Sequence, residues 1–243
     1  PLSNADILKS INIGEIGEED LDEYSKHWEY LEEKYHKGFD RFLSFVRTIL
    51  LKNKPSSNLL DEYEKNIYQK NILKKGKNTI DFLIELDGIY DKIIDLNDEN
   101  LSNEYKNLVT IMKLGLHSDE WIPTVLSYFL KFEYYNLDEF IKKLEYKFIG
   151  DLMSNVSPSK RRENLNNIIK TIEIVSKENM DILFENRELF DIDKNIFRKN
   201  INGDIYGKKY TKYLLLKMEY LMNDNSVYLS NYKEISIEHV LPQ

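Results

Sequence analysis

Residues 125–132 read VLSYFLKF, and all of these side chains except Ser127 and Lys131 are apolar. At 3.6 residues per turn, apolar side chains would cover almost the whole circumference of a helix, which is typical of a helix buried on every side. The preceding residues 118–123, SDEWIP, place a capping serine and then a proline where helix starts prefer them. We therefore expect a buried helix here, surrounded by other elements.

Helical spacing extends to both sides of this stretch. Leu21, Tyr24, Trp28, Leu31 and Tyr35 recur at intervals of three and four residues, which places them on one face of a helix. Residues 55–58, PSSN, form a break that can also cap the next helix.

After the central stretch, Asn136 followed by Glu139 resembles a capping box. Residues 210–222 form the most apolar of the later helices. The sequence therefore predicts an all-α fold, an irregular multi-helix bundle of about ten helices with no convincing strand before residue 234. The expected helices cover 21–35, 42–50, 59–67, 79–95, 100–116, 121–132, 137–148, 157–177, 179–188, 191–200 and 210–222.

Composition excludes several classes of site. The 243 residues include no cysteine, which excludes disulfides, thiolate zinc sites and a cysteine nucleophile. No apolar run approaches the roughly 18 residues that a membrane-spanning helix needs. We therefore expect a cytoplasmic protein without a membrane partner. Because the chain starts on Pro1, we also expect it to be part of a longer protein.

The charge is unevenly distributed. Residues 194–217 contain seven basic residues and one acidic residue, a net charge of +6, whereas the whole chain carries −8 and the remainder therefore −14. Lysine and arginine neutralise phosphate charge and give DNA affinity that does not depend on sequence. A solvated helix face is the alternative explanation. The candidate DNA-binding residues are Arg198, Lys199, Lys208, Lys209 and Lys212.

The last ten residues, EISIEHVLPQ (234–243), alternate like a strand and place Glu238 beside His239. A neutral histidine is a suitable general base near pH 7, and a carboxylate is a suitable ligand for magnesium. Phosphodiester hydrolysis needs a base that activates water and a cation that offsets the charge on the phosphate. In a regular strand the two side chains would point to opposite faces. Both could therefore reach one ion only through a bend near Pro242 or a bridging water.

Two stretches together carry a family resemblance. Residues 238–243, EHVLPQ, resemble the opening of the His-Me finger (HNH-like) nuclease domain of GmrSD-type modification-dependent restriction endonucleases. Residues 1–10, PLSNADILKS, are similar to the end of that family's ParB-like N-terminal domain. The order of the two stretches, with a helical region between them, also matches the family.

The resemblance implies a domain division. Residues 1–12 would end a nucleotide-binding domain, 13–232 would form a helical connecting domain, and 233–243 would be a short strand beginning a severed nuclease domain. A break near 118–136 would divide the connecting domain into two subdomains. The resemblance also implies that His239 is the catalytic base and that Glu238 is a metal ligand.

The same resemblance implies a parent protein that cleaves foreign DNA, such as phage DNA with modified cytosines, using NTP and Mg²⁺ or another divalent cation. This chain lacks the second strand, the helix and the downstream Asn or His of a complete nuclease site. It also has no glycine-rich nucleotide-binding loop. We therefore expect no cofactor and no cleavage by this chain alone.

A second hypothesis is a self-contained α-helical protein–protein interaction module without a nuclease. The 17 tyrosines and 11 phenylalanines could line a binding groove, although most are expected in the core. The gene sequence after Gln243 would distinguish the two hypotheses, because a nuclease domain requires a further strand and helix.

Overall fold

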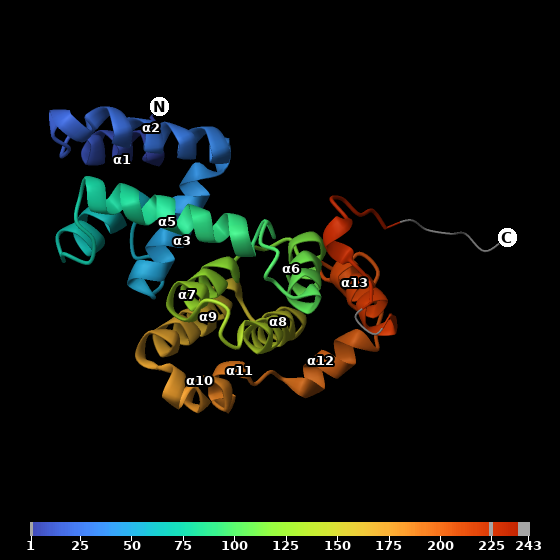
Figure 1. The fold of residues 1–243 in the computed structure, drawn as a ribbon. Helices are drawn as coiled ribbons and strands as arrows, with labels where there is room; N and C mark the ends of the chain where they lie inside the picture. Colours follow the sequence, from blue (N-terminus) through green and yellow to red (C-terminus); the bar gives the residue numbers. More distant parts are fainter. Residues whose placement is uncertain (1, 224–225, 238–243) are drawn as a thin grey trace.

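The computed structural model describes residues 2–223 and 226–237, and every regular element in these ranges is helical (Figure 1). Ten of the α-helices in these ranges have eight residues or more, which confirms the predicted all-α irregular bundle. They are α1 (Asn4–Ile13), α2 (Glu18–Tyr35), α3 (Phe39–Leu51), α5 (Lys77–Ile93), α6 (Asn103–Gly115), α7 (Ile122–Phe132), α8 (Leu137–Met153), α9 (Pro158–Ile174), α12 (Lys194–Ile201) and α13 (Thr211–Met222).

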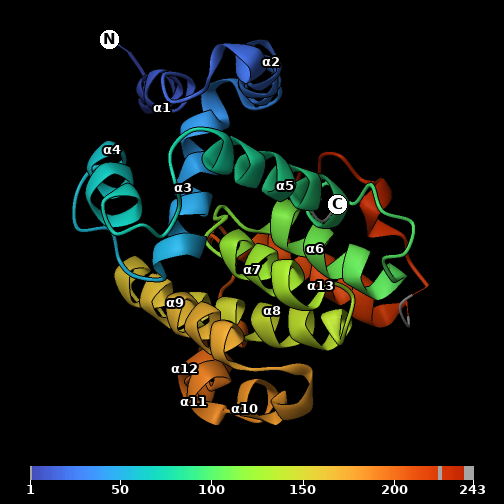
Figure 2. The same ribbon diagram turned by 60° about the vertical axis from the view of Figure 1, so that its left-hand side comes forward.

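Shorter elements connect these helices. The α-helical ones are α4 (Leu59–Asp61), α10 (Asp181–Phe184) and α11 (Arg187–Phe190). A π-helix, η2 (Glu62–Tyr68), follows α4, and 3₁₀ turns occur at η1 (His36–Gly38), η3 (Lys177–Asn179) and η4 (Leu229–Asn231). Both views place α1 and α2 at one end of the molecule and α10–α12 at the other, with α6–α9 between them (Figures 1 and 2).

The apolar stretch at residues 125–132 forms the core helix α7. Its residues from Ile122 to Phe129 are all buried, and α7 packs against α3, α5, α8 and α9. The ring of Tyr128 stacks on that of Phe140 from α8, with centroids 3.9 Å apart. The stretch 118–136, where the sequence suggested a break between subdomains, therefore contains a helix that contacts elements on both sides of it in the sequence.

Local sequence explains where many helices begin. The side chains of Ser3, Asn58, Ser102 and Ser157 accept hydrogen bonds from backbone N–H groups in the first turns of α1, α4, α6 and α9. Such caps satisfy N–H groups that have no partner inside the helix. Proline lies in the first turn of α7 and of α9, where its missing N–H costs nothing.

Four local expectations differ from the structure. Ser118 does not cap α7, because that helix begins after Trp121 and has no side-chain cap. Asn136 precedes α8 in a left-handed conformation (φ 51°) and forms no side-chain cap, whereas a capping box needs an extended cap residue. The helix expected over 59–67 becomes a π-helix from Glu62 onward. The segment expected as one helix over 179–188 begins at the end of the turn η3, contains the short helix α10 and ends inside the separate short helix α11.

The C-terminal strand predicted from residue 234 is not present in its first four residues. A strand requires a neighbouring strand for its backbone hydrogen bonds, and the described residues include none. Residues 238–243, the remainder of this predicted strand, lie outside the described residues.

Helix α13 makes its closest approach to the bundle at Gly115, the last residue of α6. A Cβ atom added there would lie 2.5 Å from the Cα of Tyr213. The buried carboxylate of Glu145 in α8 accepts a hydrogen bond from the hydroxyl of the same Tyr213 and lies 2.9 Å from Lys217 Nζ. Glycine and this acidic residue together fix one face of α13 against α6 and α8.

Candidate functional site

The basic segment identified in the sequence folds as α12, a turn and α13. Lys217 pairs with Glu145 and therefore has a structural role. The five candidate DNA-binding residues form no ion pair with any residue in the described ranges. Lys212 is half-buried, and the other four are exposed: Arg198, Lys199, Lys208 and Lys209. Their charges are therefore available to an external anion.

The outward face of α13 is apolar. Leu215, Met218, Leu221 and Met222 are exposed by 44%, 54%, 62% and 78%, and they recur at three- and four-residue spacing along the helix. The sequence indicated an apolar helix but not that half of its apolar residues would face outward. Only the positions of α6 and α8 reveal which face is covered.

The chain returns to the bundle after α13. The side chain of the buried Asn107 in α6 donates to the carbonyl oxygen of Val227 at 2.7 Å, and its own oxygen accepts from the Leu229 N–H at 2.8 Å. Leu229 is fully buried as a result. The segment leading toward residue 238 therefore runs along α6, which also packs against α13 (Figure 1).

The two residues proposed for catalysis, Glu238 and His239, lie outside the described residues. Within the described ranges, no group of three or more histidine and carboxylate side chains is arranged to hold a metal ion. Nor does any helix in these ranges combine the length and apolar character that crossing a bilayer requires.

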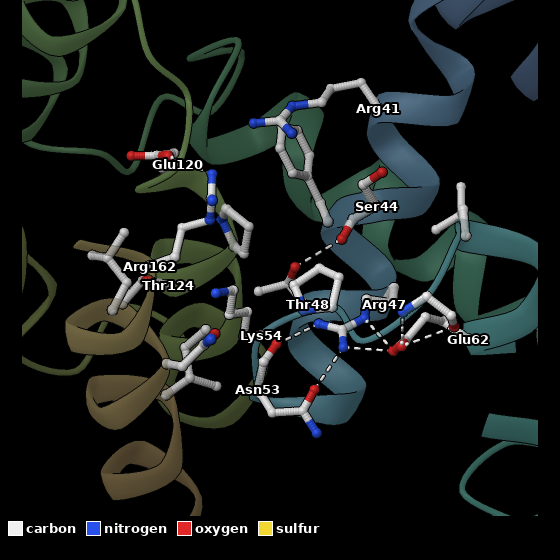
Figure 3. Close-up of a pocket in the computed structure, with 18 residues that line it drawn as sticks. Arg41, Ser44, Arg47, Thr48, Asn53, Lys54, Glu62, Glu120, Thr124 and Arg162 are labelled. Atoms are coloured by element: carbon white, nitrogen blue, oxygen red, sulfur yellow. Dashed lines mark hydrogen bonds and ion pairs between the residues drawn. The ribbon is translucent and has the colours of Figure 1, made fainter. Parts of the chain in front are cut away.

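A second candidate site is a cavity of about 410 Å³ between α3, the loop after it, α7 and α9 (Figure 3). Arg41, Ser44, Phe45 and Thr48 line it from one face of α3, because residues three or four apart lie together on a helix. By the same spacing, α9 contributes its own face with Arg162, Leu165, Asn166 and Ile169.

The loop at the cavity is held by a buried ion pair. Glu62 lies 2.6 Å from Arg47 Nη2, and its other oxygen accepts from the backbone N–H of Ser56 at 2.9 Å. Burial alone would raise the pKa of the Glu62 carboxyl, but hydrogen bonds from Ser56 and Arg47 outweigh it and lower the pKa to about 2. Arg47 also donates to the carbonyl and side-chain oxygens of Asn53. Figure 3 shows this group on the α3 side of the cavity.

On the opposite side, one carboxylate serves two arginines. Glu120 accepts from Arg161 at 3.1 Å and from Arg162 at 3.2 Å. Arg41 is paired with Asp119, whose hydrogen bond raises the pKa of the guanidinium despite its partial burial. Because Glu120 carries a single negative charge, one positive charge at this wall has no counterpart among the residues that the structure describes.

Sequence reasoning did not identify this cavity. Its polar residues come from positions 41 to 166, and no local motif connects them. The one local signal was the break at residues 55–58, which the structure places at the rim of the cavity.

Comparisons with known proteins give no relative for this chain: no family model, no curated protein and no solved structure matches it.

Proposed function

We propose that this chain is the helical connecting region of a GmrSD-like, NTP-dependent endonuclease that cleaves foreign DNA, including phage DNA with modified cytosines. It would join a nucleotide-binding domain to a nuclease domain and couple their activities. The sequence support is the order of residues 1–10 and 238–243 around a helical region. The structural observation that favours a connecting role is the uncovered apolar face of α13.

An exposed face of this kind is a typical contact surface, because covering it removes apolar area from water. We propose that the nuclease domain following residue 243 covers it. The segment after α13, residues 226–237, which we call the tail, supports this choice of occupant. Asn107 anchors residues 227–229 to α6, and α6 is also the helix on which α13 packs. A domain joined to this tail would therefore be tethered to the same part of the bundle as α13.

The basic residues of α12 and α13 would contact DNA phosphates in the parent protein. None of these five residues has an ion-pair partner in the described ranges, and all are exposed except the half-buried Lys212: Arg198, Lys199, Lys208, Lys209 and Lys212. Changing all five to glutamine should weaken DNA binding and reduce the slope of affinity against salt concentration. An unchanged salt slope would exclude them as phosphate contacts.

In the parent protein, His239 would act as the general base and Glu238 as a ligand of Mg²⁺ or another divalent cation. His239→Ala should abolish magnesium-dependent cleavage and leave folding and DNA binding intact. The assay compares modified and unmodified DNA with and without NTP. Undiminished cleavage by His239→Ala would refute the assignment of the base.

The connecting role is tested with the triple variant Leu215→Gln, Met218→Gln and Leu221→Gln in the full-length parent protein. These side chains are exposed, so the melting temperature of this helical region should change little. NTP-dependent cleavage should fall by about a hundredfold, since each of the three lost apolar contacts weakens docking by roughly 1 kcal/mol.

The matched control is Ile174→Gln, which changes an equally apolar and exposed residue at the end of α9. Full NTP-dependent cleavage by the triple variant would contradict docking on α13. Full NTP-dependent cleavage by a mixture of the isolated flanking domains, without this region, would contradict the coupling role itself.

The same face of α13 also fits the second hypothesis, a self-contained interaction module that binds a separate protein. The coding sequence beyond Gln243 distinguishes the two proposals. A further strand, a helix and an Asn or His encoded there favour the nuclease, whereas a stop codon directly after Gln243 excludes it.

A further inference from the structure

The cavity between α3, α7 and α9 plays no part in the proposed connecting role. At about 410 Å³ it falls within the range of small-molecule sites. Its walls combine apolar side chains, including Phe45, Pro123, Leu165 and Ile169, with a few charged groups. This combination is typical of a site that holds an apolar body and orients one polar group.

The charged groups leave an excess of positive charge at the cavity. Arg41 and Arg47 are neutralised by Asp119 and Glu62. Arg162 shares the single carboxylate of Glu120 with Arg161, which leaves about one positive charge uncompensated.

Lys54 adds a second positive charge. It is exposed, lines the cavity and forms no ion pair with any residue that the structure describes. Glu163, whose pKa is lowered first by Lys160 and to a smaller extent by Lys54, is already bound by Lys160 at 2.8 Å. Two uncompensated charges therefore face the cavity, which suits a dianion better than a monoanion.

The loop that carries Lys54 is held by hydrogen bonds to a buried ion pair. Asn53 and Ser56 are hydrogen-bonded to Arg47 and Glu62, so this loop cannot move without breaking hydrogen bonds to the buried ion pair. A cation on a fixed loop loses less conformational freedom when it binds an anion, and binding is correspondingly tighter.

A buried polar atom at the cavity wall also lacks a partner. The Thr124 hydroxyl, in the first turn of α7, is fully buried and forms no hydrogen bond with residues 2–223 or 226–237. Leaving such a group unpaired costs about 1–3 kcal/mol. Thr124 lines the cavity (Figure 3), and a ligand oxygen that reached its hydroxyl would satisfy this group.

From these observations we infer that the cavity binds a small-molecule phosphate monoester with a flat apolar body. The phosphate carries close to two negative charges above pH 6 and has three acceptor oxygens. Lys54 and Arg162 bind these oxygens, Thr124 donates to one of them, and the organic group packs between Phe45 and the α9 wall.

The test is titration calorimetry on the 243-residue chain at pH 7.5 with phenyl phosphate as the probe. We expect saturable binding of one molecule per chain. Benzoate and inorganic phosphate should bind at least about tenfold more weakly, because one lacks the second charge and the other lacks the apolar body. Benzyl alcohol should not bind detectably.

Two variants locate the site. Lys54→Met should weaken phenyl phosphate binding by about tenfold, which corresponds to the loss of one charge-assisted hydrogen bond. Thr124→Val should weaken it by about fivefold while the protein stays folded, because the removed hydroxyl has no partner in residues 2–223 and 226–237. The matched control, Lys199→Met, removes another exposed lysine, which has no ion pair with any described residue and does not line the cavity, and this variant should bind like wild type.

Absence of saturable phenyl phosphate binding would overturn the inference, as would equal affinity of wild type and Lys54→Met. Binding of benzyl alcohol as tight as that of phenyl phosphate would do the same. A phosphotyrosine peptide that binds more than tenfold tighter than phenyl phosphate would assign the cavity to a protein partner instead.

Discussion

Arg47 and Glu62 form a buried ion pair that joins α3 to the π-helix η2. Arg47 Nη2 lies 2.6 Å from Glu62 Oε2, and the two side chains are only 3% and 2% exposed. The second oxygen of Glu62 accepts from the backbone of Ser56 and Ser57. The pair therefore fixes the loop that borders the cavity as well as two helices.

Glu62→Gln should destabilise the chain by about 3 kcal/mol, because it leaves the buried Arg47 guanidinium without its counter-charge. Urea unfolding followed by circular dichroism measures the change. Glu64→Gln is the control, since Glu64 is an exposed carboxylate in the same π-helix. A loss of less than about 1 kcal/mol for Glu62→Gln would mean that water reaches the guanidinium and replaces the carboxylate.

The same carboxylate makes stability depend on pH. Its pKa is about 2 in the folded chain against 4.5 for the ordinary group, so the folded state favours the ionised form. The stabilisation is therefore fully present above about pH 4.5 and is lost as the pH falls toward 2. We expect the difference in unfolding free energy between wild type and Glu62→Gln to narrow over this window. A difference that stays constant from pH 7 to pH 3 would show that Glu62 has an ordinary pKa.

Gly115→Ala should loosen α13. The new Cβ would lie 2.5 Å from the Cα of Tyr213, so the two helices must separate, and we expect a loss of about 2 kcal/mol. Gly88→Ala on the exposed side of α5 is the matched control. A Cβ there meets no atom within 4 Å, and the better helix propensity should stabilise the chain by about 0.5–1 kcal/mol. Equal melting temperatures for the two variants would contradict the close approach of α6 and α13.

Asn107→Ala should release the tail from α6. It removes two hydrogen bonds to the backbone of Val227 and Leu229 and opens a gap in a buried position. Amide hydrogen exchange at residues 227–232 should become faster by about tenfold or more, because the tail can then open locally without breaking these two hydrogen bonds. Asn195→Ala, on the exposed side of α12, should leave exchange in the tail unchanged. Protection that survives in Asn107→Ala would show that burial of Leu229 alone holds the tail.

Much of the fold could be predicted because its signals are local. The stretch around Val125 is apolar on all sides, and it becomes the buried helix α7. Asn58 and Ser157 cap the helices whose starts they mark. Asn136 shows where this approach fails. The residue types fit a capping box, but the chain turns there into a left-handed conformation that a sequence motif does not specify.

The candidate sites were less predictable for a physical reason. The unpaired charge at the cavity exists only because Glu120 meets two arginines of α9, some 40 positions away in the sequence. In the same way, the outward face of α13 can be recognised only once α6 and α8 cover the other face. Pairing and covering are properties of contacts between distant segments, which local periodicity does not encode.

Local sequence signals are enough to establish that this chain is helical, roughly where its helices begin, and that basic residues concentrate near its C-terminal end. Hydrophobic periodicity and capping act over a few residues, so they can be read along the chain. Tertiary packing determines that Arg47 meets Glu62, that the Thr124 hydroxyl is left unpaired beside a cavity, and that Met218 faces outward. These features depend on which helices pack together, because burial and charge compensation are set by neighbours in space.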